Sequence, residues 1–265
     1  MPTKPIDTLK GAFSVAGLNV VVTGGNRGIG LGIATAFAQG GANVAILCRN
    51  ADSGNAAALE LAKHGGTHFA QQCDTGDFDS VLAAVDAVYA RFGKVDVLVN
   101  NAGVSTVSEF LKDEGLREWS RVVNTNLNGP AYTLYAVAPR MIEAGGGSVI
   151  NISSIGGQSL GGARHHPMAP YHVSKAGLDM FTKNMALELG DYGIRVNGIA
   201  PGPTHSDLDK DLPKEAFAQI EQNMPMHRFA EPIEIGALCV FLSSPAGAQI
   251  TGTVIVHDGG MVLGG

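Results

Sequence analysis

Two side chains in the second half of the chain have the types and spacing needed to move a proton. Tyr171 and Lys175 lie four residues apart, so on a helix they share one face. A free phenol has a pKa of about 10 and is a poor acid or base at neutral pH, but a nearby ammonium favours the phenolate and lowers that pKa. The pair could therefore deliver a proton to a carbonyl oxygen while a hydride reaches the carbon.

A hydroxyl group precedes this pair at a place where it could reach the same oxygen. Ser154 follows a strand-like run at 148–152, and its side chain is expected to point into the crevice beyond the strand end. There it could hydrogen-bond a substrate oxygen and stabilise the charge that develops on it. The alternative is an ordinary serine in a turn. Ser154, Tyr171 and Lys175 together predict a site that reduces carbonyls or oxidises alcohols.

A glycine-rich turn near the N-terminus has the pattern expected of a dinucleotide-binding site. It runs Thr-Gly-Gly-Asn-Arg-Gly-Ile-Gly over residues 23–30, between a strand-like run and a helix-like segment. Glycines let the backbone approach a pyrophosphate, which then lies at the positive N-terminus of the helix. A tight loop without a ligand is the alternative, because one glycine-rich turn is weak evidence. The residues predicted to bind cofactor here are Gly24, Asn26, Arg27, Gly28, Ile29 and Gly30.

The end of the second strand-like run indicates which dinucleotide is bound. An acidic residue there would favour NAD, but the position holds Cys48, followed by Arg49 and Asn50. Two guanidinium groups, from Arg27 and Arg49, could bind the 2′-phosphate of NADP. Both arginines could instead be solvated surface charges. We predict NADP(H) as the cofactor, with Arg49 and Asn50 among the residues that bind it.

Two further segments follow strand-like runs and are candidates for contacts with the adenosine. Asp74 follows the run at 67–73 and is placed to accept a hydrogen bond from an adenine amine. The Asn-Asn-Ala-Gly sequence at 100–103 follows the next run and would let the backbone pass close to the adenine ribose. Either segment could be ordinary turn chemistry, since Asn, Asp and Gly are common turn residues. The cofactor-binding residues predicted here are Asp74, Asn101, Ala102 and Gly103.

The elements that must position these residues alternate between strand-like and helix-like patterns along the chain. Short, nearly continuous apolar runs suit parallel strands that are buried on both faces. The alternation predicts an α/β fold: a Rossmann-like, doubly wound parallel sheet with helices on both faces and the ligand crevice at the carboxyl ends of the strands. The apolar runs lie at 20–22, 44–47, 67–73, 95–99, 148–152, 195–199 and 253–256, and the helix-like segments lie near 28–39, 53–63, 77–92, 116–143, 170–189 and 231–242.

Composition and charge argue against several other classes of protein. With 18 basic and 24 acidic residues, the formal net charge is −6, so neither nucleic acid nor an anionic membrane is expected as the main partner. The 8 histidines show no metal-binding spacing, and no metal site is predicted. The three cysteines, Cys48, Cys73 and Cys239, are far apart and predict reduced, buried thiols in a cytoplasmic protein.

Taken together, the motifs resemble the short-chain dehydrogenase/reductase family, in its compact single-domain branch. The resemblance implies a seven-stranded parallel sheet, usually a homotetramer, and hydride transfer between NAD(P) and a small-molecule alcohol or ketone. It covers the chain from about residue 18 to residue 260. The segments that carry it are 23–30, Asp74, 100–103, Ser154, Tyr171 to Lys175, and Pro-Gly-Pro-Thr at 201–204.

The same resemblance implies functional residues that spacing alone does not identify. Asn126 matches the asparagine that holds a proton-relay water beside the lysine, and would be a fourth catalytic residue. Pro201, Gly202 and Thr204 match a loop that contacts the nicotinamide. Tyr171 and Lys175 would contact the cofactor as well as the substrate.

The resemblance also frames the domain organisation and the substrate. It implies one NADP-binding oxidoreductase domain at 18–265, after an N-terminal extension at 1–17, with the segments 155–170 and 204–226 closing over the substrate. Asn-Met-Pro-Met-His-Arg at 223–228 is similar to sugar- and polyol-converting members, which predicts a sugar, a polyol or a related ketone as substrate. Reduction of β-ketoacyl thioesters or cyclic ketones is the alternative. A regulator that senses NADP(H) without turnover is the non-enzymatic alternative.

Overall fold

Seven parallel strands form one sheet at the centre of the molecule, in the order β3-β2-β1-β4-β5-β6-β7. The computed structural model describes residues 8–107, 109–112, 114–159, 168–205 and 214–263. The chain order reverses between β1 and β4, so the predicted doubly wound, seven-stranded sheet is confirmed. The strands are β1 (Asn19–Thr23), β2 (Asn43–Cys48), β3 (His68–Gln72), β4 (Val97–Asn100), β5 (Gly147–Ile152), β6 (Ile194–Pro201) and β7 (Val254–His257).

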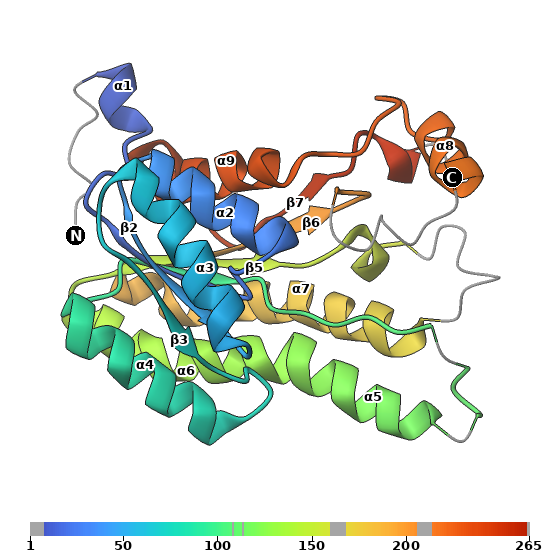
Figure 1. Cartoon of the computed structure of the whole chain (residues 1–265), viewed down its shortest axis with the longest axis horizontal. Coiled ribbons are helices and arrows are strands. Elements are labelled where there is room, and N and C mark those ends of the chain that lie inside the picture. The colour runs from blue at the N-terminus through green and yellow to red at the C-terminus, as the bar shows by residue number, and fades with distance from the viewer. Residues whose placement is uncertain (1–7, 108, 113, 160–167, 206–213, 264–265) are drawn as a thin grey trace.

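Helices cover both faces of this sheet (Figure 1). One layer contains α2 (Gly28–Gln39), α3 (Ala51–Leu61) and α9 (Pro232–Ser243). The other contains α4 (Phe78–Phe92), α5 (Gly115–Val123), α6 (Gly129–Glu143) and α7 (Ala169–Leu189). The shorter helices are α1 (Leu9–Ala12), α8 (Lys214–Gln222), η1 (Ala62–His64), η2 (Asn124–Asn128), η3 (Ile155–Gly157), η5 (Gly190–Tyr192), η7 (Pro245–Gly247) and η8 (Met261–Leu263).

Alternation along the strands divides the buried side chains between two cores. Val20 and Val22 of β1 pack with Phe37 of α2, whereas Val21, between them, packs toward α4 and α6 with Met141. Every residue of β1 is buried, which explains why its sequence reads as a continuous apolar run. The two cores fix the helices against the sheet and leave its carboxyl edge to carry polar residues.

The segment at 116–143, predicted as one helix, is interrupted in the structure by η2, a turn of π-helix. Gly129 donates its N–H to the carbonyl of Asn124, five residues earlier. Pro130 has no N–H, so it cannot donate to the carbonyl of Asn126 as a residue of a regular α-helix would. The local widening follows from this missing donor and places Asn126 on the inside of the turn.

The N-terminal extension contains a short helix that sequence periodicity did not indicate. Thr8 caps α1 by accepting a hydrogen bond from the N–H of Gly11. After the helix, Phe13 lies with its ring centroid 6.1 Å from that of Phe241, and Val15 is buried. The described part of the extension therefore packs on α9, away from the carboxyl edge of the sheet.

Two further observations concern the whole of the described chain. The three cysteines are free thiols and all are buried, as predicted. Within residues 8–263, apart from the gaps given above, no helix combines the length and the apolar character needed to cross a bilayer.

Candidate active site

The glycine-rich turn joins β1 to α2 at the carboxyl edge of the sheet. Gly24 and Gly28 have φ angles of +64° and +51°, a region that side chains with a Cβ rarely adopt. A Cβ on Gly30 would lie only 2.2 Å from the carbonyl oxygen of Gly24, so the first turn of α2 closes tightly on the loop. No acidic residue lies in that turn of the helix. Its N–H groups therefore form a cradle that fits an anion such as a pyrophosphate.

Thr23 ties this turn to the segment that follows β4. Its hydroxyl oxygen accepts hydrogen bonds from the backbone N–H groups of Asn101 and Ala102, both at 3.0 Å. In return, the amide of Asn101 donates to the carbonyl of Thr23 at 2.9 Å. The prediction for 100–103 was a backbone that approaches a ribose; the structure adds a second role, in which the Asn101 side chain braces the glycine turn.

The residues predicted to select the cofactor lie beside the turn. Arg27 and Arg49 are exposed, and neither forms an ion pair within the described part of the chain. Asn26 donates to Ser53 at 2.9 Å and joins the turn to α3. Asn50 serves as the N-cap of α3, accepting from the N–H of Ser53 at 2.9 Å. The side-chain oxygen of Asn50 is thus engaged in a cap, while both guanidinium groups stay available for a phosphate.

Two other predicted contacts have local partners. Asp74 is exposed after β3 and accepts from the N–H of Gly76 at 3.0 Å, which is the turn chemistry considered as the alternative. After β6, a Cβ on Gly202 would lie 2.7 Å from the Cβ of Asp258, so the loop is packed closely. Thr204 is buried, and its hydroxyl donates to the carbonyl of Gly202 at 3.0 Å. Asp74 and the loop from Pro201 to Thr204 lie at the carboxyl ends of their strands.

Tyr171 and Ser154 meet at the same edge of the sheet. Ser154 follows β5 and caps η3, and its side chain hydrogen-bonds the phenol of Tyr171 on α7. Burial raises the pKa of Tyr171 above its usual value, whereas the bond with Ser154 acts in the opposite direction. The phenol therefore holds its proton at neutral pH, as a group that donates a proton must. The predicted lowering of this pKa, by the ammonium of Lys175 together with the positive charge of an oxidised nicotinamide, concerns the protein with cofactor bound and stays a prediction.

Lys175 lies one turn further along α7 and is buried. Its ammonium donates to the carbonyl of Ile152, at the end of β5, over 2.8 Å, and lies 5.8 Å from the centroid of the Tyr171 ring. The ammonium is thus bonded to the backbone at the end of β5 and lies close to the phenol. Burial lowers the pKa of Lys175 to about 8, and the carboxylate of Asp179 opposes that effect.

The π-turn brings Asn126 next to the lysine. Its side-chain oxygen accepts from the N–H of Val104 at 2.8 Å, and its amide donates to the carbonyl of Val104 at 2.9 Å and to Ser174 at 3.2 Å. A Cβ built on Gly103 would lie 3.4 Å from that oxygen and 3.6 Å from the Lys175 ammonium. Gly103, Asn126 and Lys175 thus surround one point, and a side chain at residue 103 would fill it.

A buried polar network that sequence reasoning missed holds α7 against the strands. Thr133 of α6 donates to Asn100 at 2.6 Å, Asn100 donates to Asn151 at 2.9 Å, and Asn151 donates to Thr182 of α7 at 2.9 Å. Asn100 and Asn151 are polar residues inside otherwise apolar strand runs, and this was the available signal. The network runs across β4 and β5 and fixes the helix that carries Tyr171.

The two predicted substrate segments are described only in part. Residues 155–157 form η3, and a Cβ on Gly157 would lie 2.8 Å from the backbone of Lys175, so the start of the first segment packs on α7. Residues 160–167 and 206–213 of these segments lie outside the described residues. In the part of the chain that is described, no group of three or more His, Cys, Asp or Glu side chains could hold a metal ion.

Comparisons with known proteins agree with this arrangement. A family model described as enoyl-(acyl carrier protein) reductase matches residues 24–262. D-Threitol dehydrogenase of Mycolicibacterium smegmatis is 39% identical over 252 residues, which are 95% of each chain. A 3-oxoacyl-[acyl-carrier-protein] reductase of Chlamydia muridarum is 40% identical over 243 residues, 91% of this chain and 96% of the relative.

A solved structure gives the same result for the fold. The crystal structure of a short-chain type dehydrogenase/reductase from Mycobacterium marinum superposes with a TM-score of 0.90 at 34% identity, over 96% of this chain and 99% of the other. The family model, which matches residues 24–262, spans the glycine turn from Gly24 and the helix that carries Tyr171 and Lys175.

Proposed function

The chain belongs to the short-chain dehydrogenase/reductase family, and from that premise we propose that it transfers hydride between NADP(H) and a sugar, a polyol or a related ketone. The relatives are dehydrogenases and reductases that act on CH–OH and C=O groups, and this chain is an oxidoreductase of that class. The proposal concerns the cofactor, the substrate and the roles of individual residues.

One observation carries the assignment of catalytic roles. The phenol of Tyr171 hydrogen-bonds Ser154 and lies above a buried ammonium, that of Lys175, at the edge of the sheet where the glycine turn opens. A regulator without turnover has no need of this combination. The sensor alternative is therefore set aside.

Each side chain has a separate task in this scheme. The nicotinamide, when bound, supplies or accepts the hydride. Tyr171 donates its proton from Oη to the carbonyl oxygen, and Ser154 hydrogen-bonds that oxygen as negative charge develops on it. The ammonium of Lys175 lies behind the phenol and stabilises the phenolate that remains. The side chain of Asn126 is fixed by its bonds to the backbone of Val104. Its task in this scheme is to orient the polar groups beside Lys175 that return a proton to Tyr171.

The choice of NADP(H) rests on the charge near α2 and α3. Arg27 and Arg49 are exposed beside the turn, and Cys48 stands where an acidic residue would repel a 2′-phosphate and bind a ribose hydroxyl. The glycine cradle supports dinucleotide binding, through Gly24, Gly28 and their neighbours.

The proposed substrate class follows from similarity to two relatives. Similarity to a D-threitol dehydrogenase favours a polyol, and the segments 155–170 and 204–226 are proposed to close over it. An equally similar 3-oxoacyl-[acyl-carrier-protein] reductase favours a β-ketoacyl thioester as the second candidate.

The first test is turnover. Oxidation of NADPH and of NADH is followed with a panel of ketoses, β-ketoacyl thioesters and cyclic ketones, and with polyols in the reverse direction. Tyr171→Phe removes only the phenolic oxygen, so turnover should fall by about 10²–10⁴-fold while NADPH affinity stays within a few-fold. A mutant that keeps more than a tenth of the turnover would exclude Tyr171 as the proton donor.

The second test concerns the cofactor. Arg49→Asp should lower the ratio of NADPH to NADH affinity by about tenfold or more, because a charge-assisted contact with the 2′-phosphate is lost and a carboxylate takes its place. Arg117→Asp on α5 makes the same change of charge far from the turn and serves as the control. An unchanged ratio in Arg49→Asp, or an equal change in Arg117→Asp, would contradict the assignment.

We also propose a cytoplasmic homotetramer. Leu116 of α5 and Val173, Met180 and Leu187 of α7 are exposed apolar side chains on adjacent helices, a surface suited to a second subunit. Three reduced thiols suit the cytoplasm. Light scattering measures the assembly directly, and a monomer at micromolar concentration would refute it.

A further inference from the structure

Asp179 is a buried acid that the catalytic scheme does not use. It lies on α7 one turn beyond Lys175, so the two side chains share a face of the helix. Only 8% of its surface is exposed. A carboxylate is costly to bury unless it is paired, and none of the salt bridges within the described residues includes Asp179.

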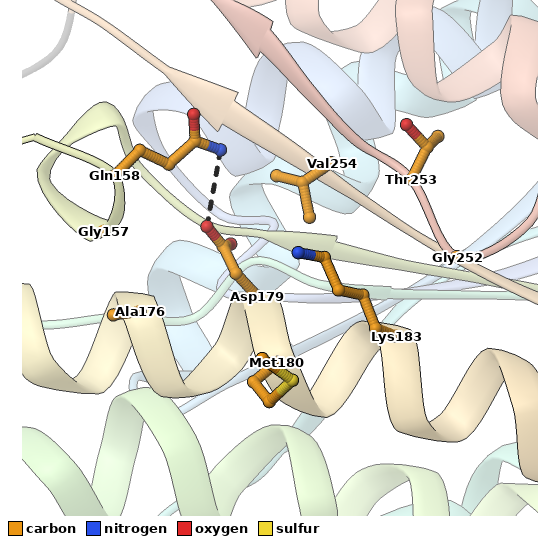
Figure 2. Close-up of a pocket in the computed structure, with 9 residues that line it drawn as sticks. All are labelled: Gly157, Gln158, Ala176, Asp179, Met180, Lys183, Gly252, Thr253 and Val254. Carbon is orange, nitrogen blue, oxygen red and sulfur yellow. Dashed lines mark hydrogen bonds between the residues drawn. The ribbon is translucent and has the colours of Figure 1, made fainter.

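The partners of Asp179 lie on either side of Ser154 in the sequence. Gln158, just after η3, donates to its Oδ2 at 3.4 Å, as Figure 2 shows. The hydroxyl of Ser153 donates to the carbonyl of Lys175 at 3.3 Å and also hydrogen-bonds the Asp179 carboxylate. Asp179 is thereby connected to the residue before Ser154 and to a residue four positions after it.

Asp179 lines a cavity of about 540 Å³ beside α7, and its other carboxylate oxygen, Oδ1, is buried. Oδ1 has no hydrogen-bond partner among the described residues. Lys183 extends toward the same cavity from the next turn of the helix (Figure 2). The two hydrogen bonds to Ser153 and Gln158 need only an acceptor, which an asparagine would supply without the cost of a buried charge. The two hydrogen bonds therefore do not explain why residue 179 is an ionisable acid.

We propose that Asp179 is a positioning residue, which holds the segment that carries Ser154 against α7 and keeps the ammonium of Lys175 charged. The inference rests on the proposed roles of Tyr171 and Lys175 in proton transfer. It does not depend on whether the cofactor is NADP(H) or NAD(H), nor on which carbonyl compound is the substrate.

The groups around Lys175 leave Asp179 as the source of negative charge. On α7, the titratable neighbours are Tyr171, which holds its proton, and Lys183, which lies two turns away and is exposed. The end of β5 presents the carbonyl of Ile152, and η2 presents the amide of Asn126; both are neutral. Burial lowers the pKa of Lys175 to about 8 and Asp179 raises it, so removal of this carboxylate takes the pKa lower still.

The test compares Asp179→Asn with three other variants. Asp179→Asn keeps the shape and an acceptor but removes the charge, Asp179→Glu restores the charge, and Gln158→Ala removes one bond of the clamp from an exposed residue. Lys183→Gln removes the other charge at the cavity and is the matched control. For each, kcat is measured from pH 6 to pH 10 with whichever cofactor the unaltered enzyme uses, together with the free energy of unfolding in urea from pH 7 to pH 10.

In Asp179→Asn, the alkaline limb of kcat should move to lower pH by about one pH unit, which makes kcat about fivefold lower at pH 8. Asp179→Glu should return the limb toward its original position. Gln158→Ala should lower kcat without moving the limb, because the charge remains. Lys183→Gln should keep kcat within about twofold and leave the limb in place. An unmoved limb in folded Asp179→Asn, or an equal shift in Lys183→Gln, overturns the proposal.

The unfolding measurement separates this inference from the proposed function. An amine that loses its proton earlier in the folded than in the unfolded chain makes stability rise with pH, starting from the pKa of the folded state. In Asp179→Asn this rise should begin about one pH unit lower, whether or not a substrate has been found. If turnover is absent but the rise moves, the proposed function fails and the electrostatic link stands. If the increase in stability begins at the same pH in Asp179→Asn as in the unaltered protein, Asp179 does not control the charge of Lys175. Should Asp179→Asn not fold, a Gln158→Ala enzyme with unchanged kcat would overturn the clamp.

Discussion

The hydroxyl of Thr23 offers a sharp test of how the cofactor cradle is held together. Replacement by valine keeps the shape of the side chain but removes the oxygen that accepts two backbone N–H groups, those of Asn101 and Ala102. Thr23 itself is only 2% exposed, so water has little access to replace that acceptor. A backbone donor left without a partner in such a place costs about 1–2 kcal/mol. Two such donors make Thr23→Val less stable by about 2–4 kcal/mol.

The same substitution should reach the cofactor site. A methyl group needs more room than the 3.0 Å that now separates the oxygen from each N–H, so residues 101–103 must move away from the glycine turn. We therefore expect NADPH affinity to fall by about tenfold, which corresponds to about 1.4 kcal/mol. Urea unfolding measures the stability and fluorescence titration measures the affinity.

A matched variant separates this effect from the general cost of losing a threonine hydroxyl. Thr251→Val removes an oxygen that accepts a single N–H, from Val196, at an exposed residue where water can take its place. Its cost should stay below about 1 kcal/mol, with unchanged NADPH affinity. If Thr23→Val lies within about 0.5 kcal/mol of the unaltered protein and binds NADPH equally well, the hydroxyl is not what joins the two segments, and the reasoning fails.

Two further predictions follow from the same site. Lys175→Met should abolish efficient turnover yet raise the free energy of unfolding at pH 7 by about 2–3 kcal/mol, because the buried amine has its pKa lowered from 10.5 to about 8. As the pH rises, Lys175 loses its proton in the folded protein before it does so in the unfolded chain. The free energy of unfolding of the unaltered protein should therefore increase between about pH 8 and pH 10.5, and this increase should be absent in Lys175→Met. A Lys175→Met protein that is less stable at pH 7 and still shows the increase would contradict the prediction. Gly30→Ala should weaken NADPH binding by about tenfold or more and destabilise by about 1–3 kcal/mol, since its Cβ would lie 2.2 Å from the carbonyl oxygen of Gly24. Gly190→Ala is the control, because the position has open space around the Cβ and an ordinary φ of −59°; it should be neutral or slightly stabilising. Similar urea unfolding curves and NADPH affinities for Gly30→Ala and Gly190→Ala would refute the steric argument.

The sheet could be predicted from the sequence because its signal is local. A strand buried on both faces must be apolar at nearly every position, and β1, with all five residues buried, is such a case. The expected helix at 28–39 coincides with α2, because a glycine turn precedes it and Gly40 and Gly41 follow it. Tyr171 and Lys175 share a face of α7 for an equally local reason, the helical period.

The rest of the site could not be read locally, because it depends on contacts between distant segments. Thr23 and Asn101 are 78 residues apart, and no pattern within either segment shows that they are bonded. Asn50 is predicted as a cofactor contact, and the structure adds a second role for it, as the N-cap of α3. Asp179 lies within a stretch that reads as an ordinary helix, and the role proposed for it emerges only when η3 is packed against α7.

The pKa of Tyr171 shows how the same limit affects chemistry. Sequence spacing places an ammonium near the phenol, and Coulomb attraction alone would lower the pKa. The structure adds the orientation, in which Lys175 donates to the carbonyl of Ile152, and the burial, which raises the pKa of the phenol. Proximity in sequence therefore gives the identity of the interacting groups, while the direction of the pKa shift depends on how deeply each group is buried and on what it bonds.

The π-turn before α6 illustrates why one irregular element can decide the geometry of the site. In a regular α-helix, Asn124 and Asn128 would be stacked one turn apart, with Asn126 on the opposite side. The structure keeps the first contact, because Asn128 donates to Asn124 at 2.9 Å, and Asn124 in turn donates to the carbonyl of Gly76. The wider turn at Pro130 leaves Asn126 on the inner side, fully buried, with its amide committed to Val104 and its oxygen near Lys175. Three asparagines in alternate positions thus have two different tasks: Asn124 and Asn128 bind each other, and Asn126 faces the lysine.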